Sequence, residues 1–138
     1  MPKRVNGLEI CEATTLLDKR LTSQNALHQT PNFLYLCNML LYNVTLIIDD
    51  SVAEEWLQWM KEVHIPEVMA TEKFISNRLL KVLDSPNEGV TYCSQYVVEN
   101  EADYQDYQTN FAPALQAKLQ TKFENKFVAF RTLMEFIS

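Results

Sequence analysis

Polar residues at alternating positions of predicted β-strands are the groups in this sequence whose types and spacing suit chemistry. If side chains alternate along each strand, six of them project from one face of a sheet: Asn43, Thr45, Ser76, Arg78, Gln95 and Arg131. Two guanidinium groups with amides and hydroxyls suit a carboxylate or an enolate-like oxygen, and hence a small anionic ligand. The same groups suit hydrogen bonds and ion pairs across a dimer interface, which is the interpretation that we favour.

His64 is a candidate acid/base residue. It stands at the predicted end of a helix, just before Pro66, where the helix dipole favours the imidazolium form. Glu62 or Glu67 lies close enough in sequence to pair with it as an acid/base couple. The more ordinary interpretation is a histidine that caps the last carbonyl groups of the helix, and we expect that role more often than catalysis.

Other kinds of site lack the residues that they need. Only one of the two histidines lies in the main domain and no ligand spacing accompanies it, so we predict no metal site. The two glycines, Gly7 and Gly89, exclude a glycine-rich phosphate loop, and we expect no cofactor. Cys93 has no basic neighbour in sequence and is expected to be a small buried residue. Trp56 and Trp59 are expected in the core.

The elements that must position these residues follow one another from Met39 as strand, helix, strand, strand, helix, strand. This order predicts an α+β fold of the ferredoxin-like βαββαβ type, with a four-stranded antiparallel sheet and helices on one face. The expected strands are 40–48, 74–83, 90–99 and 126–137, and the expected helices are 51–64, 100–113 and 114–123.

Local signals set the expected helix ends. Ser51 and Glu54 form a capping-box pattern that predicts the first helix start, and Pro66 is expected to follow its end. Asn100 is predicted to cap the next helix, and Pro113 to end it and open a short third helix.

Alternation in the last strand divides its side chains into two sets. Because Arg131 is assigned to the polar face, the set opposite it is expected in the core: Val128, Phe130, Thr132 and Met134. The exposed face would then mix polar groups with four apolar residues: Phe74, Leu80, Val97 and Leu133. Such a face is unusually apolar for a monomer, and we predict a homodimer.

The chain has 138 residues and a formal net charge of −6, which suits one acidic domain. An acidic surface without a basic stripe repels phosphate, so we predict no binding of nucleic acid. No apolar stretch is long enough to span a bilayer, so we predict no membrane association. Three scattered cysteines indicate a reducing compartment, and we predict a cytoplasmic protein.

Residues 1–38 differ in character from the rest of the chain. They show weak helical periodicity and then a polar, turn-rich stretch, and nothing in them pairs naturally with a complete six-element domain. One interpretation is a true N-terminal extension, either disordered or forming a helix that lies on the domain. The other, which we favour, is that Met39 is the true start and these residues lie ahead of it. The ferredoxin-like domain is expected at 39–138.

Four segments together resemble a known family: MLLYNVTLIIDDSVAEEWLQWMKEVHIPEVM, TYCSQYVVEN, FAPALQAKL and KFVAFRTLMEF. The sequence from Met39 to Phe136 resembles the small bacterial proteins known only as domain of unknown function 4286. Its most specific parts are His64-Ile65-Pro66 and the segment 111–115. The resemblance implies a dimeric α/β-barrel, in which two protomers pack sheet against sheet, and it implies no catalytic residues.

Two functions remain open from sequence. The first is a homodimer that binds a small molecule or a protein partner at its sheet face or in the adjoining cleft. The second is a cofactor-free enzyme, similar to the monooxygenases and isomerases of the barrel group, in which His64, Asn43 or Arg131 moves a proton or stabilises an oxyanion. An enclosed pocket with convergent polar groups would favour an enzyme, and a space filled by aromatic side chains would favour a binding module.

Overall fold

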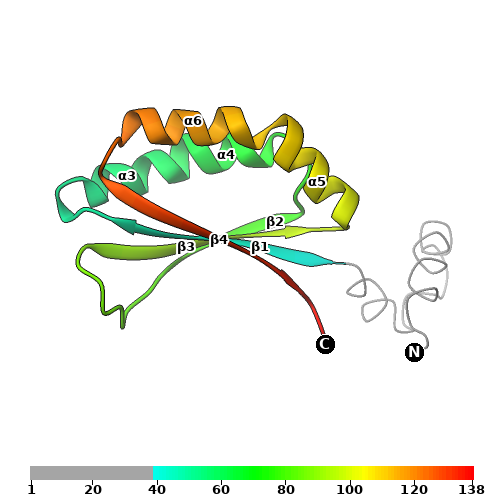
Figure 1. Cartoon of the computed structure of the whole chain (residues 1–138), viewed down its shortest axis with the longest axis horizontal. Helices are drawn as coiled ribbons and strands as arrows, with labels where there is room; N and C mark the ends of the chain where they lie inside the picture. Colours follow the sequence, from blue (N-terminus) through cyan, green and yellow to red (C-terminus); the bar gives the residue numbers. More distant parts are fainter. Residues whose placement is uncertain (1–38) are drawn as a thin grey trace, which may run out of the picture. The chain divides into compact units, whose positions relative to one another are not determined.

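The computed structural model describes residues 39–138, and the fold is that of the compact unit Leu40–Met134. Its elements follow the predicted βαββαβ order (Figure 1). Our interpretation of residues 1–38 lies outside the described residues. Within residues 39–138, no helix is long and apolar enough to cross a membrane.

Four strands form one antiparallel sheet in the order β2-β3-β1-β4. Their bounds are β1 (Leu40–Ile48), β2 (Ser76–Lys81), β3 (Val90–Val98) and β4 (Phe127–Glu135). The long strand β3 pairs antiparallel with both β1 and β2. The backbone amide of Asp49, just after β1, donates to the carbonyl of Lys126, just before β4, at 2.9 Å, so these strands also run antiparallel. The two edges are therefore β2 and β4.

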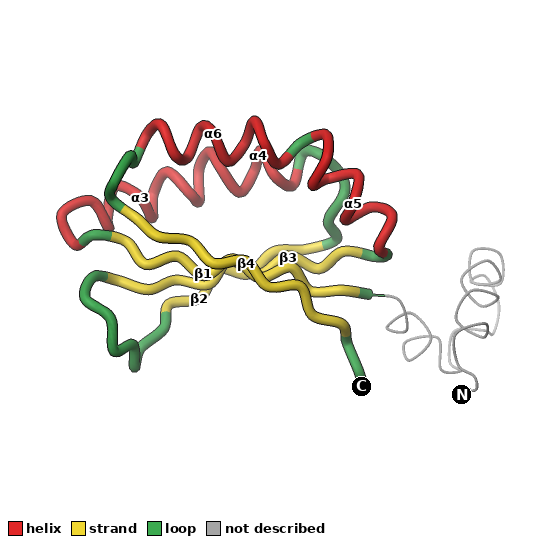
Figure 2. Tube along the Cα trace, in the orientation of Figure 1, coloured by secondary structure: helices red, strands yellow, loops and turns green. Residues whose placement is uncertain are grey.

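The helices lie on one face of this sheet (Figure 2). The first connection contains η2 (Asp50–Val52), α3 (Ala53–Trp59), η3 (Met60–His64) and α4 (Ile65–Met69). The second connection contains α5 (Glu101–Asn110) and α6 (Ala112–Lys122). In the described part of the chain no helix covers the other face, which we call the open face.

The start of the first helical segment is capped differently from our prediction. The carboxylate of Asp49 accepts hydrogen bonds from the Ser51 backbone amide at 2.8 Å and the Ser51 hydroxyl at 2.6 Å. Val52, which precedes α3, makes no side-chain cap. The predicted Ser51–Glu54 capping box is therefore wrong, because a single turn of 3₁₀-helix places the cap two residues earlier.

The predicted helix end before Pro66 is also wrong, because the helix continues to Met69. Its middle, η3, is a π-helical turn in which the Ile65 amide bonds to the Met60 carbonyl five residues earlier. Proline has no amide hydrogen and its ring displaces the preceding turn. A widened turn just before Pro66 accommodates both effects, and α4 begins with this proline in its first turn.

The second helical connection follows the sequence signals closely. The Asn100 side chain accepts from the Asp103 amide at 2.8 Å and caps α5 as predicted. The chain breaks at Phe111 and restarts as α6 with Pro113 in the first turn. Both signals are local, since they depend on side-chain groups within three residues of the helix end.

The last strand turns its side chains opposite to our prediction. Phe127 and Ala129 pack against the core, while Val128 and Phe130 are 53% and 55% exposed. Because side chains alternate along a strand, Arg131 shares the helix-covered face with Phe127 and Ala129. Both sets of residues are partly apolar, so composition alone did not reveal which set faces the core.

The core consists of two adjoining clusters between helices and sheet. One is built on aromatic residues from both layers: Tyr42, Phe74, Tyr96 and Tyr107. The other surrounds the fully buried Trp56, which stacks on Tyr92 at a centroid distance of 5.0 Å. The expectation that Phe74 lies on the exposed face is wrong, since it is buried in the first cluster.

Candidate functional site

Five of the six predicted polar residues share the open face. The strand register places Asn43 opposite Gln95, and Gln95 opposite Arg78. Thr45 and Ser76 lie two residues away on the same face of their strands. The sixth residue, Arg131, projects from the opposite face, so the sheet does not bring the two arginines together.

A short hydrogen-bonded chain runs across the open face. The Asn43 side-chain amide donates to the Thr45 hydroxyl at 3.0 Å, and that hydroxyl lies 3.5 Å from the sulfur of Cys93. The carbonyl oxygen of the Asn43 side chain is buried and has no hydrogen-bond partner among the described residues. Cys93 is a half-buried free thiol. These groups are therefore mostly engaged with one another.

Apolar side chains occupy much of the rest of the open face. Those most exposed come from the two edge strands: Leu80 on β2, and Val128, Phe130 and Met134 on β4. Val97, expected here from sequence, lies between them on β3, whereas Leu133 follows Arg131 to the helix side. The open face thus has apolar edges around a polar centre.

A small cavity of about 30 Å³ lies between the helices and the sheet, where the two core clusters meet. Most of its wall is apolar or aromatic. Its polar side chains come from four different elements: His64, Ser94, Gln116 and Arg131. About 15 Å³ is enough to hold one water molecule, so this cavity accommodates a few atoms rather than a ring.

His64 forms the polar centre of this cavity. Its side chain is only 8% exposed, and its Nδ1 atom is buried without a hydrogen-bond partner among the described residues. Burial lowers the pKa of His64 to about 4, against a smaller opposing effect of Glu67. At neutral pH the imidazole is therefore uncharged, so the predicted imidazolium at a helix end is wrong.

The π-helical turn explains how His64 reaches this position. Its ring stacks on Trp59, five residues earlier, with 5.3 Å between ring centroids. Residues five apart align on one face of a π-helix, whereas an α-helix aligns residues three and four apart. The turn that Pro66 accompanies thus directs His64 toward the sheet.

Arg131 and Gln116 lie at the boundary of the cavity. Both also line an open groove of about 400 Å³ between α6 and β4. Arg131 is exposed, but its positive charge still acts on two tyrosines. Burial raises the pKa of Tyr104 and Tyr107, and the charge of Arg131 partly opposes that rise. The groove is therefore a route by which solvent meets the cavity.

Tyrosines from β1, β3 and α5 form part of the cavity wall. Burial raises the pKa of Tyr96 to about 12 and also raises that of Tyr107, so both hydroxyls keep their protons at neutral pH. The ring of Tyr107 meets that of Phe74 edge to face at 4.7 Å. This wall supplies neutral hydroxyl groups on a rigid aromatic surface.

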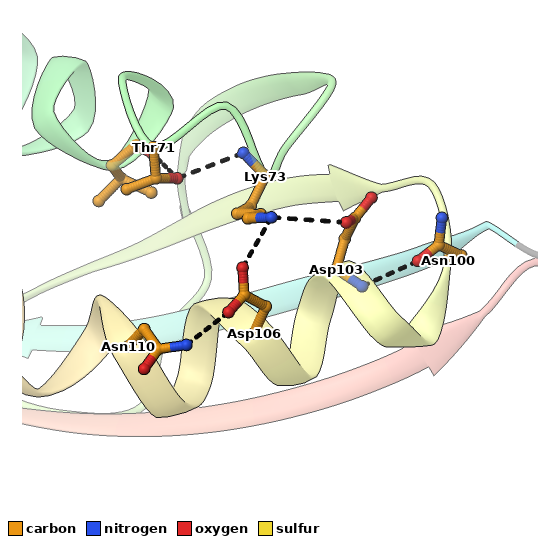
Figure 3. Close-up of polar contacts among 7 residues, drawn as sticks. Thr71, Lys73, Asn100, Asp103, Asp106 and Asn110 are labelled. Atoms are coloured by element: carbon orange, nitrogen blue, oxygen red, sulfur yellow. Dashed lines mark hydrogen bonds and ion pairs between the residues drawn. The ribbon is translucent and has the colours of Figure 1, made fainter.

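An ion-pair network fastens the loop that carries Phe74 to α5 (Figure 3). The Lys73 ammonium lies 2.7 Å from a carboxylate oxygen of Asp106 and 3.7 Å from one of Asp103. The Lys73 backbone amide also bonds to the Thr71 hydroxyl at 3.3 Å. The network thereby holds Phe74 against the aromatic wall.

The candidate site residues named from the sequence did not include two polar residues that line the cavity, Ser94 and Gln116. Ser94 is 1% exposed and lies on the core face of β3. Gln116 shows no signal in sequence, because a glutamine on a helix is ordinary in solvent. Only the packing of α6 over β4 brings it beside Arg131.

Within residues 39–138, no group of three or more histidine, cysteine, aspartate or glutamate side chains is arranged to hold a metal ion.

A family model described as "Domain of unknown function (DUF4286)" matches residues 39–137. Among curated proteins, none matches the sequence.

Solved structures share the fold at low sequence identity. SnoaB, a cofactor-independent oxygenase from Streptomyces nogalater, is 12% identical in a mutant form, with a TM-score of 0.57 over 74% of this chain and 96% of its own. A protein of the ethyl tert-butyl ether D (EthD) family from Bacillus halodurans is 9% identical, with a TM-score of 0.56 over 71% of this chain and 99% of its own. A proposed antibiotic biosynthesis monooxygenase from Caulobacter crescentus is 16% identical, with a TM-score of 0.53 over 78% of this chain and 97% of its own.

These similarities show a shared ferredoxin-like α+β fold. At such identities they carry no residue from one protein to another, because the same scaffold supports many functions.

Proposed function

Because this chain belongs to the DUF4286 family of domains of unknown function, its activity must be argued from its own geometry, and we propose a homodimeric domain that binds a small molecule between its helices and its sheet. The observation that carries the proposal is His64, which lines a cavity and whose buried Nδ1 atom has no described partner. Buried polar atoms are nearly always hydrogen-bonded, so this atom calls for a partner from solvent or a ligand.

The open face supports the homodimer. Its exposed apolar side chains on β2 and β4 make a surface that a monomer would leave in contact with water. The unpartnered carbonyl oxygen of Asn43 at the centre of this face adds a buried acceptor that a donor from a second protomer would satisfy. On this proposal the two sheets pack face to face, and each protomer keeps its own cavity on the far side.

The cavity supports small-molecule binding over binding of a protein partner at that site. Tyrosine, methionine and leucine side chains fill most of the space between helices and sheet, and the remaining cavity shares Gln116, Leu119 and Arg131 with the groove beside α6 and β4. A protein segment needs a longer groove, whereas one functional group of a small molecule fits.

NMR spectroscopy of the imidazole groups tests this proposal directly. Phenol, benzamide and benzoate serve as small probes, and we expect at least one to shift the His64 signals and raise the melting temperature. His64→Leu, which assigns the signals and removes the polar atom, should abolish that stabilisation. Thr45→Val, a matched change on the open face, should preserve it. If none of the probes shifts the His64 signals, the proposed site is wrong.

A cofactor-free enzyme is the second candidate, and one observation favours it. An uncharged buried imidazole beside a guanidinium combines a base with a cation that stabilises an enolate. Asn43 no longer belongs to this candidate, since it lies on the open face. If the protein is such an enzyme, it should accelerate deuterium exchange at an acidic C–H bond of a model ketone. The variant His64→Leu should then lose that acceleration.

The proposed location is the cytoplasm. Cys93 is a free thiol, which fits the reducing compartment that the scattered cysteines indicate.

A further inference from the structure

The cavity and the groove between α6 and β4 share three lining residues: Gln116, Leu119 and Arg131. The cavity, of about 30 Å³, is enclosed mainly by apolar side chains, and the groove, of about 400 Å³, opens to solvent. A molecule lying in the groove would therefore place one end at Arg131 and project one small group past it, toward His64.

Arg131 is a cation without a described counter-ion. The ion pairs of residues 39–138 are all made by lysines: Lys73, Lys118 and Lys122. No aspartate or glutamate lines the groove, where the side-chain amides of Gln116 and Gln120 accompany the guanidinium. In a chain with a net charge of −6, this is a local positive site surrounded by hydrogen-bond donors.

His64 supplies the second polar contact, on the inner side. Its Nδ1 atom is unpartnered and its side chain is more than nine-tenths buried. An uncharged imidazole that carries its proton on Nδ1 is a donor toward an oxygen acceptor. Arg131 and His64 both line this one small cavity, and each has an N–H group that can donate to an acceptor.

From this arrangement we infer that the site binds a monocarboxylate, whose carboxylate group occupies the small cavity between Arg131 and His64 and whose body lies in the groove between α6 and β4. The inference rests on the proposed function and names its ligand class. A carboxylate has the few heavy atoms that such a cavity admits, and its planar pair of oxygens matches a guanidinium. A single cation matches a single negative charge, which favours a carboxylate over phosphate.

Benzoate and its uncharged isostere benzamide test the inference on the full-length protein. We expect benzoate to bind more tightly than benzamide and to shift the NMR signals of both His64 and the Arg131 guanidinium. Arg131→Gln should lower the affinity for benzoate about tenfold or more, which is the usual effect of losing a charge-assisted hydrogen bond. The affinity for benzamide should not change. Arg131→Lys, which keeps the charge but loses the planar fork, should give an intermediate affinity.

Arg78→Gln is the matched control, because it removes the same charge from the open face on the other edge strand. It should leave benzoate binding unchanged. Equal affinities for benzoate and benzamide, or full benzoate affinity in Arg131→Gln, would overturn the carboxylate inference and leave the proposed binding function standing. Displacement of benzoate by inorganic phosphate at matched ionic strength would also overturn it. If neither of these probes nor phenol shifts the His64 signals, the proposed function itself fails.

Discussion

At the scale of single residues, His64 shows how burial decides chemistry. The sequence pattern places this residue at a predicted helix end, where the dipole would favour its charged form. In the structure it is enclosed between Trp59 and the cavity wall, and burial lowers its pKa to about 4. The uncharged ring is available as a hydrogen-bond donor or as a base at neutral pH, which neither a surface histidine nor a capping imidazolium would be.

This lowered pKa predicts how stability changes with pH. The unfolded chain binds a proton at His64 below about pH 6.5, whereas the folded chain does so only below about pH 4. The unfolded state therefore binds more protons in this window, and stability falls as the pH falls through it, by roughly 3 kcal/mol. The lowered pKa of His64 already includes the charges near the ring: Glu67 raises it, whereas Lys118 and Arg131 lower it.

Urea unfolding of the wild type and of His64→Gln at several pH values from 7 to 4 measures this contribution. Carboxylates titrate in both proteins, so the difference between them isolates His64. Parallel stability curves for the two proteins would contradict the assigned burial of the ring.

At the scale of elements, the connections decide where the site residues point. The π-helical turn before Pro66 aims His64 at the sheet, and the Lys73 network holds the following loop to α5 (Figure 3). The hairpin between β2 and β3 depends on Gly89, whose φ of +90° is unfavourable for any residue with a side chain. These features are local, yet each fixes a contact between distant parts of the chain.

Gly89→Ala is expected to destabilise the fold by about 1–3 kcal/mol, because the new side chain strains the backbone. A Cβ at this position would also lie 2.5 Å from the carbonyl oxygen of Ile48, at the end of β1. Thermal and urea unfolding measure the change. Glu88→Ala, at the exposed neighbouring position, is the control and should unfold like the wild type.

Lys73→Gln should lower the melting temperature at low ionic strength. The neighbouring carboxylates raise the pKa of Lys73, chiefly through the hydrogen bond from its ammonium to Asp106, and that attraction is lost in the variant. Because the pair is close to the surface, the difference from the wild type should shrink in about 1 M salt, where screening is strong. A difference independent of salt would show that packing of the lysine stem, rather than charge, explains the effect.

At the scale of the whole molecule, we propose different roles for the two faces of the sheet. The helix-covered face contains the core and the proposed ligand site, and the open face contains the surface that we propose as the dimer interface. Binding at one face leaves the other free, so dimer formation and ligand binding can be tested separately.

Phe130→Lys tests the dimer. Phe130 is 55% exposed on the open face, so the change should not disturb the core, while a charge in a packed sheet interface is unfavourable. We expect light scattering to give a dimer mass for the wild type and a monomer mass for the variant at micromolar concentration. Leu83→Lys, at a loop residue that is 89% exposed, should remain a dimer. A monomeric wild type would refute the proposal.

The order of the elements and most of their boundaries could be predicted from the amino-acid sequence alone. The alternation in β1 and β3 and the Asn100 and Pro113 signals are local, and the structure confirms them. Side-chain alternation and capping involve residues only a few positions apart, so both can be predicted from a single sequence.

Packing between distant segments, by contrast, selects which face of β4 meets the core and where Arg131 therefore lies. Both sets of alternating residues in β4 contain apolar side chains, so either face is compatible with the pattern, and pairing with β1 selects one. For His64 the widened turn at Pro66 is local, but its burial beside α6 depends on contacts between distant segments. A site formed by residues from a helix, another helix and an edge strand has no local signature in sequence, because its geometry exists only once those elements have packed.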